Sequence, residues 1–271
     1  MVEVEAFGVS EQGPRPLNED RIGWRVPDDP LLRQRKGALF VLADGLGGHE
    51  SGEVASAIAV DTLIEEYYSP SSHGRVEPAL QRAVQNANLK IYDLAQREAR
   101  HRSMATTLVG LAVTDMSAYV AHVGDSRVYH WRAGVLTQLT TDHSEIAELV
   151  RLRLVRREKL REHPARNALT RTVGSQLLLR PDFLRQPVRP DDRFLLCSDG
   201  LWAEVDESEI AQVIATSAPA DACRTLVERA LAAGSEDNVS AQVVRIVALE
   251  EDAAEEARPR RWPAFLRGRA P

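Results

Sequence analysis

The sequence contains little cysteine and no long apolar segment. Its two cysteines, Cys197 and Cys223, lie far apart and form no Cys-x-x-Cys motif, which favours a reducing cytosol over a disulfide framework. No apolar run approaches the roughly 20 residues of a membrane span. The first ten residues have neither a basic region nor a long apolar one, unlike a secretory signal. We therefore expect a cytoplasmic protein that does not cross or bind a membrane.

Two phosphate-binding signatures are also missing. The sequence has no Gly-Lys-Ser or Gly-Lys-Thr of a P-loop, and its glycines do not follow the Gly-x-Gly-x-x-Gly spacing of a dinucleotide site. The net charge of -6 and the sequence pI near 5.7 argue against broad attraction to nucleic acid. Any anionic partner must therefore be recognised by a local site.

The hydrophobic content is high enough for one large domain. Apolar residues make up 44% of the 271 residues, and helical or strand periodicity continues to about Ala248. The following residues form an acidic block and a basic block with prolines and no apolar period. We predict one domain over residues 1–249 and a disordered or weakly docked tail over residues 250–271.

The stretch around Asp44 has the pattern of a rigidly held ligand site. An apolar strand over Gly37–Leu42 stops at this carboxylate, and Gly45, Gly47 and Gly48 follow it directly. An amphipathic helix begins soon afterwards. This order suits a bound metal or phosphate, although a glycine-rich turn after a strand is also an ordinary connection.

Two further acids stand next to predicted strands. Asp199 follows the apolar strand Phe194–Cys197, and Asp237 precedes the strand Ala241–Val247. If these strands and the one that leads to Asp44 are neighbours in one core, the three carboxylates converge and repel one another unless cations lie between them. Oxygen ligands without histidine or cysteine at metal spacing favour Mg²⁺ or Mn²⁺ over zinc.

Other segments indicate a mixed fold and a basic surface. A helix with an apolar stripe is predicted from Pro78, and short strands are predicted over 107–114, 118–123 and 127–131, where turn-sized gaps indicate antiparallel hairpins. Residues 151–180 are rich in arginine. This run is either a solvated helix face or a surface for a phosphorylated, acidic partner.

Eight short motifs, in order, resemble the metal-dependent serine/threonine protein phosphatases of type 2C in their compact bacterial form. The resemblance extends from about Val4 to Val247. The motifs are Arg15 with Asn18-Glu19-Asp20, Asp44-Gly45-x-Gly47-Gly48-His49, Met104-Ala105-Thr106-Thr107, Val123-Gly124-Asp125-Ser126-Arg127, Thr141-Asp142-His143-Ser144, Leu169-Thr170-Arg171, Cys197-Ser198-Asp199-Gly200-Leu201-Trp202, and Asp237-Asn238-Val239-Ser240.

The resemblance implies a fold and a set of cofactors. The fold is α+β, a four-layer α-β-β-α sandwich of two antiparallel sheets flanked by helices, with the metals in a cleft at one end. Two Mn²⁺ or Mg²⁺ ions are implied, and bacterial members take a third, weaker one. The basic region after Ser144 corresponds to the family's mobile flap.

The resemblance also implies metal ligands. Asp44 bridges two metals, the carbonyl of Gly45 binds one of them, and Asp199 with Asp237 binds the other. Asp125, together with Asp199, corresponds to the third metal site.

Three further residues complete the implied site. Glu19 and Asp20 correspond to the acids that fix metal-bound waters. Arg15 corresponds to the residue that grips the substrate phosphate with its planar guanidinium. Arg15, Asp20 and Asp44 are thus the expected catalytic residues.

The implied reaction is hydrolysis of phosphoserine and phosphothreonine on proteins. A metal-bridging hydroxide attacks phosphorus in line without a phosphoenzyme. The chain departs from animal members, which have a histidine at the position of Leu46. His49, His143 or water on the third metal could protonate the leaving oxygen instead, and each histidine could equally serve a structural hydrogen bond.

Expected partners are phosphorylated proteins, namely targets of a serine/threonine kinase and the kinase itself, acted on by a monomer. Two other functions remain open at this point. A pseudophosphatase would use the same fold to bind phosphoproteins, but it would need broken ligands, and all the acids are present. A hydrolase of small phosphoesters would use the same ligands.

Overall fold

The computed structural model describes residues 1–47, 51–70, 75–155 and 168–249. Its strands are β1 (Glu3–Glu11), β2 (Asp20–Arg25), β3 (Ala38–Leu46), β4 (Ala105–Thr106), β5 (Leu108–Val113), β6 (Ser117–Val123), β7 (Arg127–Arg132), β8 (Val135–Gln138), β9 (Asp182–Pro187), β10 (Arg193–Cys197) and β11 (Val239–Ala248). Its α-helices are α1 (Pro30–Lys36), α2 (Gly52–Tyr67), α3 (Val76–Arg97), α4 (Glu145–Arg151), α5 (Asp199–Trp202), α6 (Glu207–Thr216) and α7 (Pro219–Ala232).

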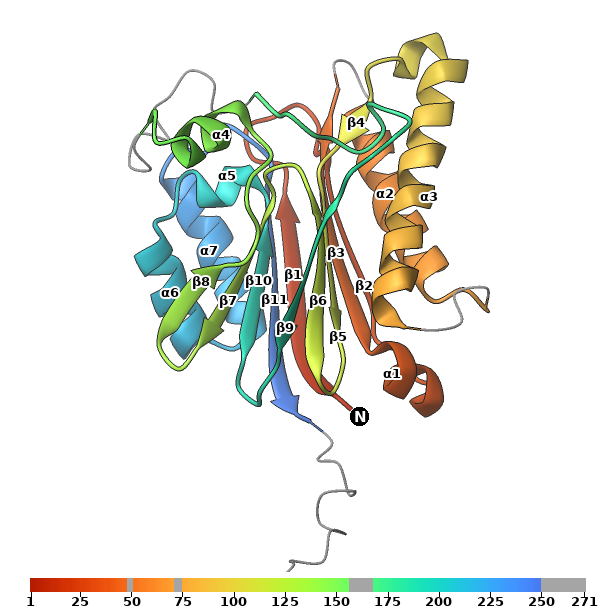
Figure 1. Ribbon diagram of the computed structural model, residues 1–271. Coiled ribbons are helices and arrows are strands. Elements are labelled where there is room, and N and C mark those ends of the chain that lie inside the picture. The colour runs from red at the N-terminus through yellow and green to blue at the C-terminus, as the bar shows by residue number, and fades with distance from the viewer. Residues whose placement is uncertain (48–50, 71–74, 156–167, 250–271) are drawn as a thin grey trace, which may run out of the picture.

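The strands form two antiparallel sheets. One has the order β1-β11-β10-β7-β8, and the other has the order β2-β3-β5-β6-β9, with the short β4 paired to β3. A turn joins β5 to β6 in an antiparallel hairpin, as the sequence predicts. The predicted hairpin of 118–123 with 127–131 is wrong, because β6 and β7 lie in different sheets and β7 pairs with β8 instead. Figure 1 shows the two sheets side by side, with α2 and α3 outside one and α6 and α7 outside the other.

Three apolar clusters hold these layers together. Leu63 of α2 and Leu80 of α3 pack on one sheet, and Cys223 of α7 packs with strand residues on the other. Between the sheets, Phe40 and Phe194 belong to a third cluster. Three interfaces between four layers confirm the predicted α-β-β-α sandwich.

Strand β3 runs further than its apolar segment. It continues through Asp44 to Leu46, because Gly45 and Leu46 pair with Thr106 and Ala105 of β4. Helix α2 then begins at Gly52. The predicted order of strand, acid, glycine loop and helix is therefore present, with Gly48, His49 and Glu50 outside the described residues.

Strand β2, which forms an edge of its sheet, was not predicted from the sequence. This strand pairs with β3 in a register that sets Asp20 opposite Asp44. Strands β8 and β9 and helix α1 were also not predicted.

None of the helices in the described part of the chain is long and apolar enough to cross a membrane. The predicted tail, residues 250–271, lies outside the described residues. The last described strand, β11, ends at Ala248 and pairs with both β1 and β10.

Candidate metal centre

Acidic residues from both sheets meet at one end of the sandwich. Asp20 and Asp44 face each other across β2 and β3, and opposite residues of an antiparallel pair lie about 4.5–5.5 Å apart at Cα. From the other sheet, Asp199 follows β10 and Asp237 precedes β11, while Asp125 lies in the turn between β6 and β7. The predicted convergence thus occurs between two packed sheets and not within one.

The backbone of Asp44 is fixed by two threonines. Its N–H donates to Oγ1 of Thr107 at 2.9 Å, and its carbonyl accepts from Oγ1 of Thr106 at 2.8 Å and from the N–H of Thr107 at 2.8 Å. These bonds hold the end of the strand and so fix the backbone from which the Asp44 carboxylate extends.

Glu19 is held next to Asp44 by three contacts. Its N–H donates to Oδ1 of Asn238 at 2.8 Å, its carbonyl accepts from the N–H of Gly45 at 3.1 Å, and its Oε1 accepts from the N–H of Gly52 at 3.2 Å. A Cβ at Gly45 would lie 2.2 Å from the carbonyl oxygen of Gly52. Only glycine fits at this close approach between the β3 end and α2.

Asp20 and Asp199 each carry an oxygen without a hydrogen-bond partner among the described residues. Oδ2 of Asp20 accepts from Oγ of Ser198 at 2.8 Å, but within the described part of the chain no donor reaches the buried Oδ1 of Asp20 or that of Asp199. Buried carboxylate oxygens that lack donors are costly unless a cation neutralises them. These orphaned atoms fit a metal site.

The raised pKa values of the clustered carboxyl groups also show that their negative charges are unfavourable without a cation. Removal from water and then the nearby carboxylates raise the pKa of Asp20 to about 7 and hold that of Asp44 well above its usual range. Removal from water, followed by Asp237, raises the pKa of Asp199 to about 6. Removal from water, followed by Asp199, raises that of Asp125 well above its usual range. The protein alone therefore disfavours full ionisation of the cluster.

Arg15 lies at the rim of the cluster. Its Nη2 donates to Oδ2 of Asp237 at 2.8 Å and its Nε to the carbonyl of Glu236 at 3.0 Å. Half of its side chain remains exposed to solvent, at 51%. A guanidinium in this place can reach an incoming anion as well as Asp237.

The Asp125 turn is supported by buried partners. Trp202 donates its indole N–H to the carbonyl of Asp125 at 3.0 Å. The guanidinium of Arg127 lies 3.5 Å from the Trp202 ring centroid and forms a double hydrogen bond with Asp142, at 3.0 and 2.7 Å. The motifs that contain Arg127, Asp142 and Trp202 thus contact one another and hold the Asp125 turn in place. This structural role was not predicted from the sequence.

A second group of possible ligands lies beside this turn. One atom each from His122, His143 and Asp182 lies within 4.8 Å of the others. His143 accepts the N–H of Gly124 at Nδ1, at 3.1 Å, and its Nε2 lies 3.1 Å from Oδ2 of Asp182 and 3.2 Å from Nη1 of Arg171. Arg171 also donates to Asp182, at 2.9 Å. The ring nitrogens of His122 have no hydrogen-bond partner among the described residues, and its ring packs on that of His143, with the centroids 4.6 Å apart.

The same contacts bear on the roles left open for His143. Both of its ring nitrogens are engaged and only 5% of the residue is exposed, which favours the structural hydrogen bond over the role of proton donor. His49 lies outside the described residues. Leu46 pairs with Ala105 beside the cluster.

Two packed antiparallel sheets with a crowded carboxylate cluster at one end define a metal-dependent hydrolase. A family model for protein phosphatase 2C matches residues 16–248, which is most of the sequence. The chain belongs to the protein phosphatase 2C family.

Relatives and solved structures agree with this assignment. The protein phosphatase PhpP of Streptococcus pneumoniae is 36% identical over 220 residues, covering 80% of this chain and 88% of the relative. The catalytic domain of the serine/threonine phosphatase PstP, in complex with two manganese ions, aligns with a TM-score of 0.79 at 30% identity, covering 92% and 100% of the two chains. PppA, described as a regulatory component of the type VI secretion system in Pseudomonas aeruginosa, aligns with a TM-score of 0.74 at 34% identity, covering 90% and 97%.

Proposed function

We propose that this chain hydrolyses phosphoserine and phosphothreonine esters on proteins with the help of Mn²⁺ or Mg²⁺. The observation that carries the proposal is the meeting of carboxylates from both sheets, where one oxygen of Asp20 and one of Asp199 lack a hydrogen-bond donor in the described part of the chain. Oxygen-only ligands suit these two hard cations. The PstP structure with two manganese ions supports the same assignment.

The proposed ligands are the residues that converge at the cleft. Asp44 and the carbonyl of Gly45 would hold one ion, Asp44 would share the second with Asp199 and Asp237, and Asp125 with Asp199 would hold a third. When bound, the ions supply an activated water as nucleophile and neutralise charge on the phosphate. Glu19 and Asp20 would orient waters through carboxylates whose positions are fixed by Gly52 and Ser198.

Arg15 is the proposed phosphate-binding residue. It lies beside Asp237, and its planar guanidinium matches the oxygens of a phosphate group. Its bonds to Asp237 and to the Glu236 carbonyl use Nη2 and Nε. Arg15 would thus orient the phosphate, while Asp44 and Asp20 would organise the nucleophile.

The same proposal includes the extent of the catalytic domain, the compartment and the protein substrates. Residues 1–249 would form the catalytic domain of a cytoplasmic monomer. Its substrates would be proteins phosphorylated by a serine/threonine kinase, and the kinase itself. The free, buried thiols of Cys197 and Cys223 are consistent with a reducing compartment.

The test is phosphate release from a phosphothreonine peptide and from p-nitrophenyl phosphate, with Mn²⁺ and with EDTA. We expect release from both substrates only with the metal. Hydrolysis of the aryl phosphate but of no phosphopeptide or phosphoprotein would favour a small-phosphoester hydrolase. No turnover of either substrate with Mn²⁺ would favour a pseudophosphatase.

A further inference from the structure

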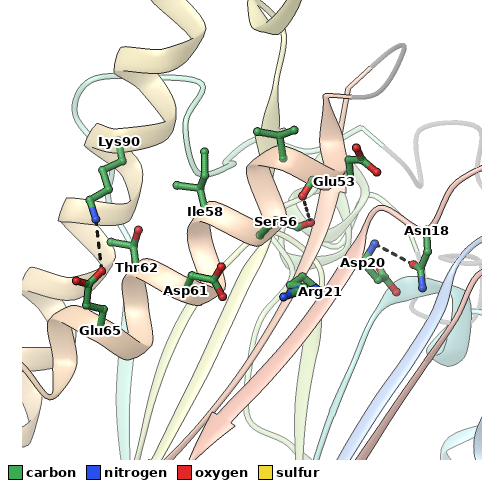
Figure 2. Close-up of a pocket in the computed structure, with 12 residues that line it drawn as sticks. Asn18, Asp20, Arg21, Glu53, Ser56, Ile58, Asp61, Thr62, Glu65 and Lys90 are labelled. Carbon is green, nitrogen blue, oxygen red and sulfur yellow. Dashed lines mark hydrogen bonds and ion pairs between the residues drawn. The ribbon is translucent and has the colours of Figure 1, made fainter.

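A groove of about 680 Å³ runs along α2, the helix that packs on β2 and β3. Figure 2 shows Asn18 and Asp20 at one end of it and Glu65 with Lys90 at the other. The side chains of Glu53, Ile58 and Asp61 project from the helix along its length (Figure 2).

The groove is continuous with the candidate metal centre. Asp20 lines it and is 93% buried, with its Oδ1 unpartnered among the described residues. Asn18, which also lines it, accepts the N–H of Asp20 at 3.1 Å. A peptide whose phosphorylated side chain entered the cleft could therefore continue directly into the groove.

The lining of the groove has a definite chemistry. Glu53, Asp61 and Glu65 are exposed and spaced by eight and four residues, so that they share one face of α2. Val54 and Ile58 are partly buried between them and give the groove an apolar component. This combination suits an extended segment with basic side chains and aliphatic stems.

Two cations also line the groove and reduce its negative charge. Lys90 forms an ion pair with Glu65 at 4.0 Å, and both side chains are largely exposed. Because such an exposed pair is weak, a basic side chain of a bound peptide can replace Lys90 at Glu65 at little cost in free energy. Arg21 is exposed on β2. Even with both cations, the carboxylates of the groove are in excess over its basic groups.

We propose that this groove binds the segment of a phosphoprotein substrate that flanks the phosphorylated residue, and that it selects lysine or arginine there. The inference rests on the proposed function, whose substrate class it narrows. Eight helical residues from Glu53 to Asp61 span about 12 Å, which an extended peptide covers in three to four residues. The preferred basic residue would therefore lie about three to four positions from the phosphothreonine.

The test compares matched phosphothreonine peptides with lysine, glutamine or glutamate at these positions, on either side of the phosphothreonine. We expect wild-type kcat/KM to follow the order lysine, glutamine, glutamate on one side. The double variant Asp61→Lys, Glu65→Lys should lower kcat/KM for the lysine peptide at least fivefold and raise it for the glutamate peptide. Its turnover of p-nitrophenyl phosphate should not change, because neither residue belongs to the catalytic cluster.

The matched control is Glu228→Lys, which reverses an exposed charge on α7, outside the other sheet. It should keep the wild-type order of peptides. Added salt should reduce the wild-type preference, since the contact is electrostatic.

Two results would contradict the inference in different ways. Hydrolysis of all three peptides at equal rates, or an unchanged order in the double variant, would overturn the groove assignment and leave the proposed function standing. Failure of the wild-type enzyme to hydrolyse any peptide or phosphoprotein, despite turnover of the aryl phosphate, would overturn both.

Discussion

At the scale of single residues, Arg15 and Asp237 touch each other but have different proposed roles. Arg15→Ala should remove a charge-assisted contact to phosphate, on the order of 1.5–3 kcal/mol, and should raise KM roughly 10- to 150-fold. Mn²⁺ affinity should change little, because the Arg15–Asp237 pair is solvent-exposed. Steady-state kinetics over a grid of substrate and Mn²⁺ concentrations measure both effects.

Asp237→Ala is the matched comparison in that experiment. It should weaken metal binding and lower kcat, with partial rescue at high Mn²⁺. A large increase in the Mn²⁺ requirement of Arg15→Ala, with KM unchanged, would instead make Arg15 a support for the acidic cluster.

Arg127 offers a stability prediction. Its guanidinium is buried, pairs with both oxygens of Asp142 and stacks on Trp202. Arg127→Ala should lower the free energy of unfolding by about 3–5 kcal/mol, because it leaves a buried carboxylate without its counter-ion. Urea denaturation monitored by circular dichroism measures the change.

The control is Arg245→Ala, which removes an exposed ion pair with Asp191. That loss should cost less than about 1 kcal/mol. Equal costs for the two variants would show that the buried contacts of Arg127 do not stabilise the fold.

At the scale of elements, the sequence predicted strands that end in acids but not their partners. The apolar runs before Asp44 and Asp199 are plain in the sequence, and β3 and β10 confirm both. Strand β2 was missed because its sequence, DRIGWR, mixes charged residues and glycine at a half-exposed edge. The Asp20–Asp44 pair depends on the register of that edge strand, which local patterns do not encode.

The neighbours of His143 were likewise not predictable from local sequence patterns. His122 and Asp182 are partners across β6 and β9, and β9 follows the arginine-rich segment and ends in proline. No periodicity pointed to that strand. The roles expected for the acids came from the family motifs, while the structure supplies their neighbours and their burial.

Deletion of the residues that follow β11 should not affect catalysis. The strand pairs with β1 on one side and β10 on the other, and it ends at Ala248. Because the later sequence has no apolar period, removal of residues 251–271 should leave turnover of p-nitrophenyl phosphate within about twofold of wild type. A large loss of kcat in the purified, folded truncation would show that the segment contributes to the catalytic domain.

At the scale of the whole molecule, the carboxylate cluster should make the stability of the metal-free protein depend on pH. Burial raises the pKa of Asp20 to about 7 and that of Asp199 to about 6, so the folded state retains protons that the unfolded state releases above about pH 4. Stability in EDTA should therefore fall as pH rises from 5 towards 7, by about 1.4 kcal/mol per pH unit for each retained proton.

Urea midpoints at pH 5 and pH 7.5 measure this dependence, and the variant Asp20→Asn provides the control. The variant should show a smaller fall, because one of the raised groups no longer titrates. A metal-free protein that gains stability over this range, to the same extent in both forms, would contradict the account of the cluster.

The most direct test of the central claim is calorimetric titration of the metal-free protein with Mn²⁺. The account holds that the acids converge in order to bind metal, and it predicts at least two ions per wild-type chain. It predicts the loss of both in Asp44→Asn, because Asp44 is the proposed bridging ligand. Binding of the same number of Mn²⁺ ions with the same affinity by Asp44→Asn would contradict it.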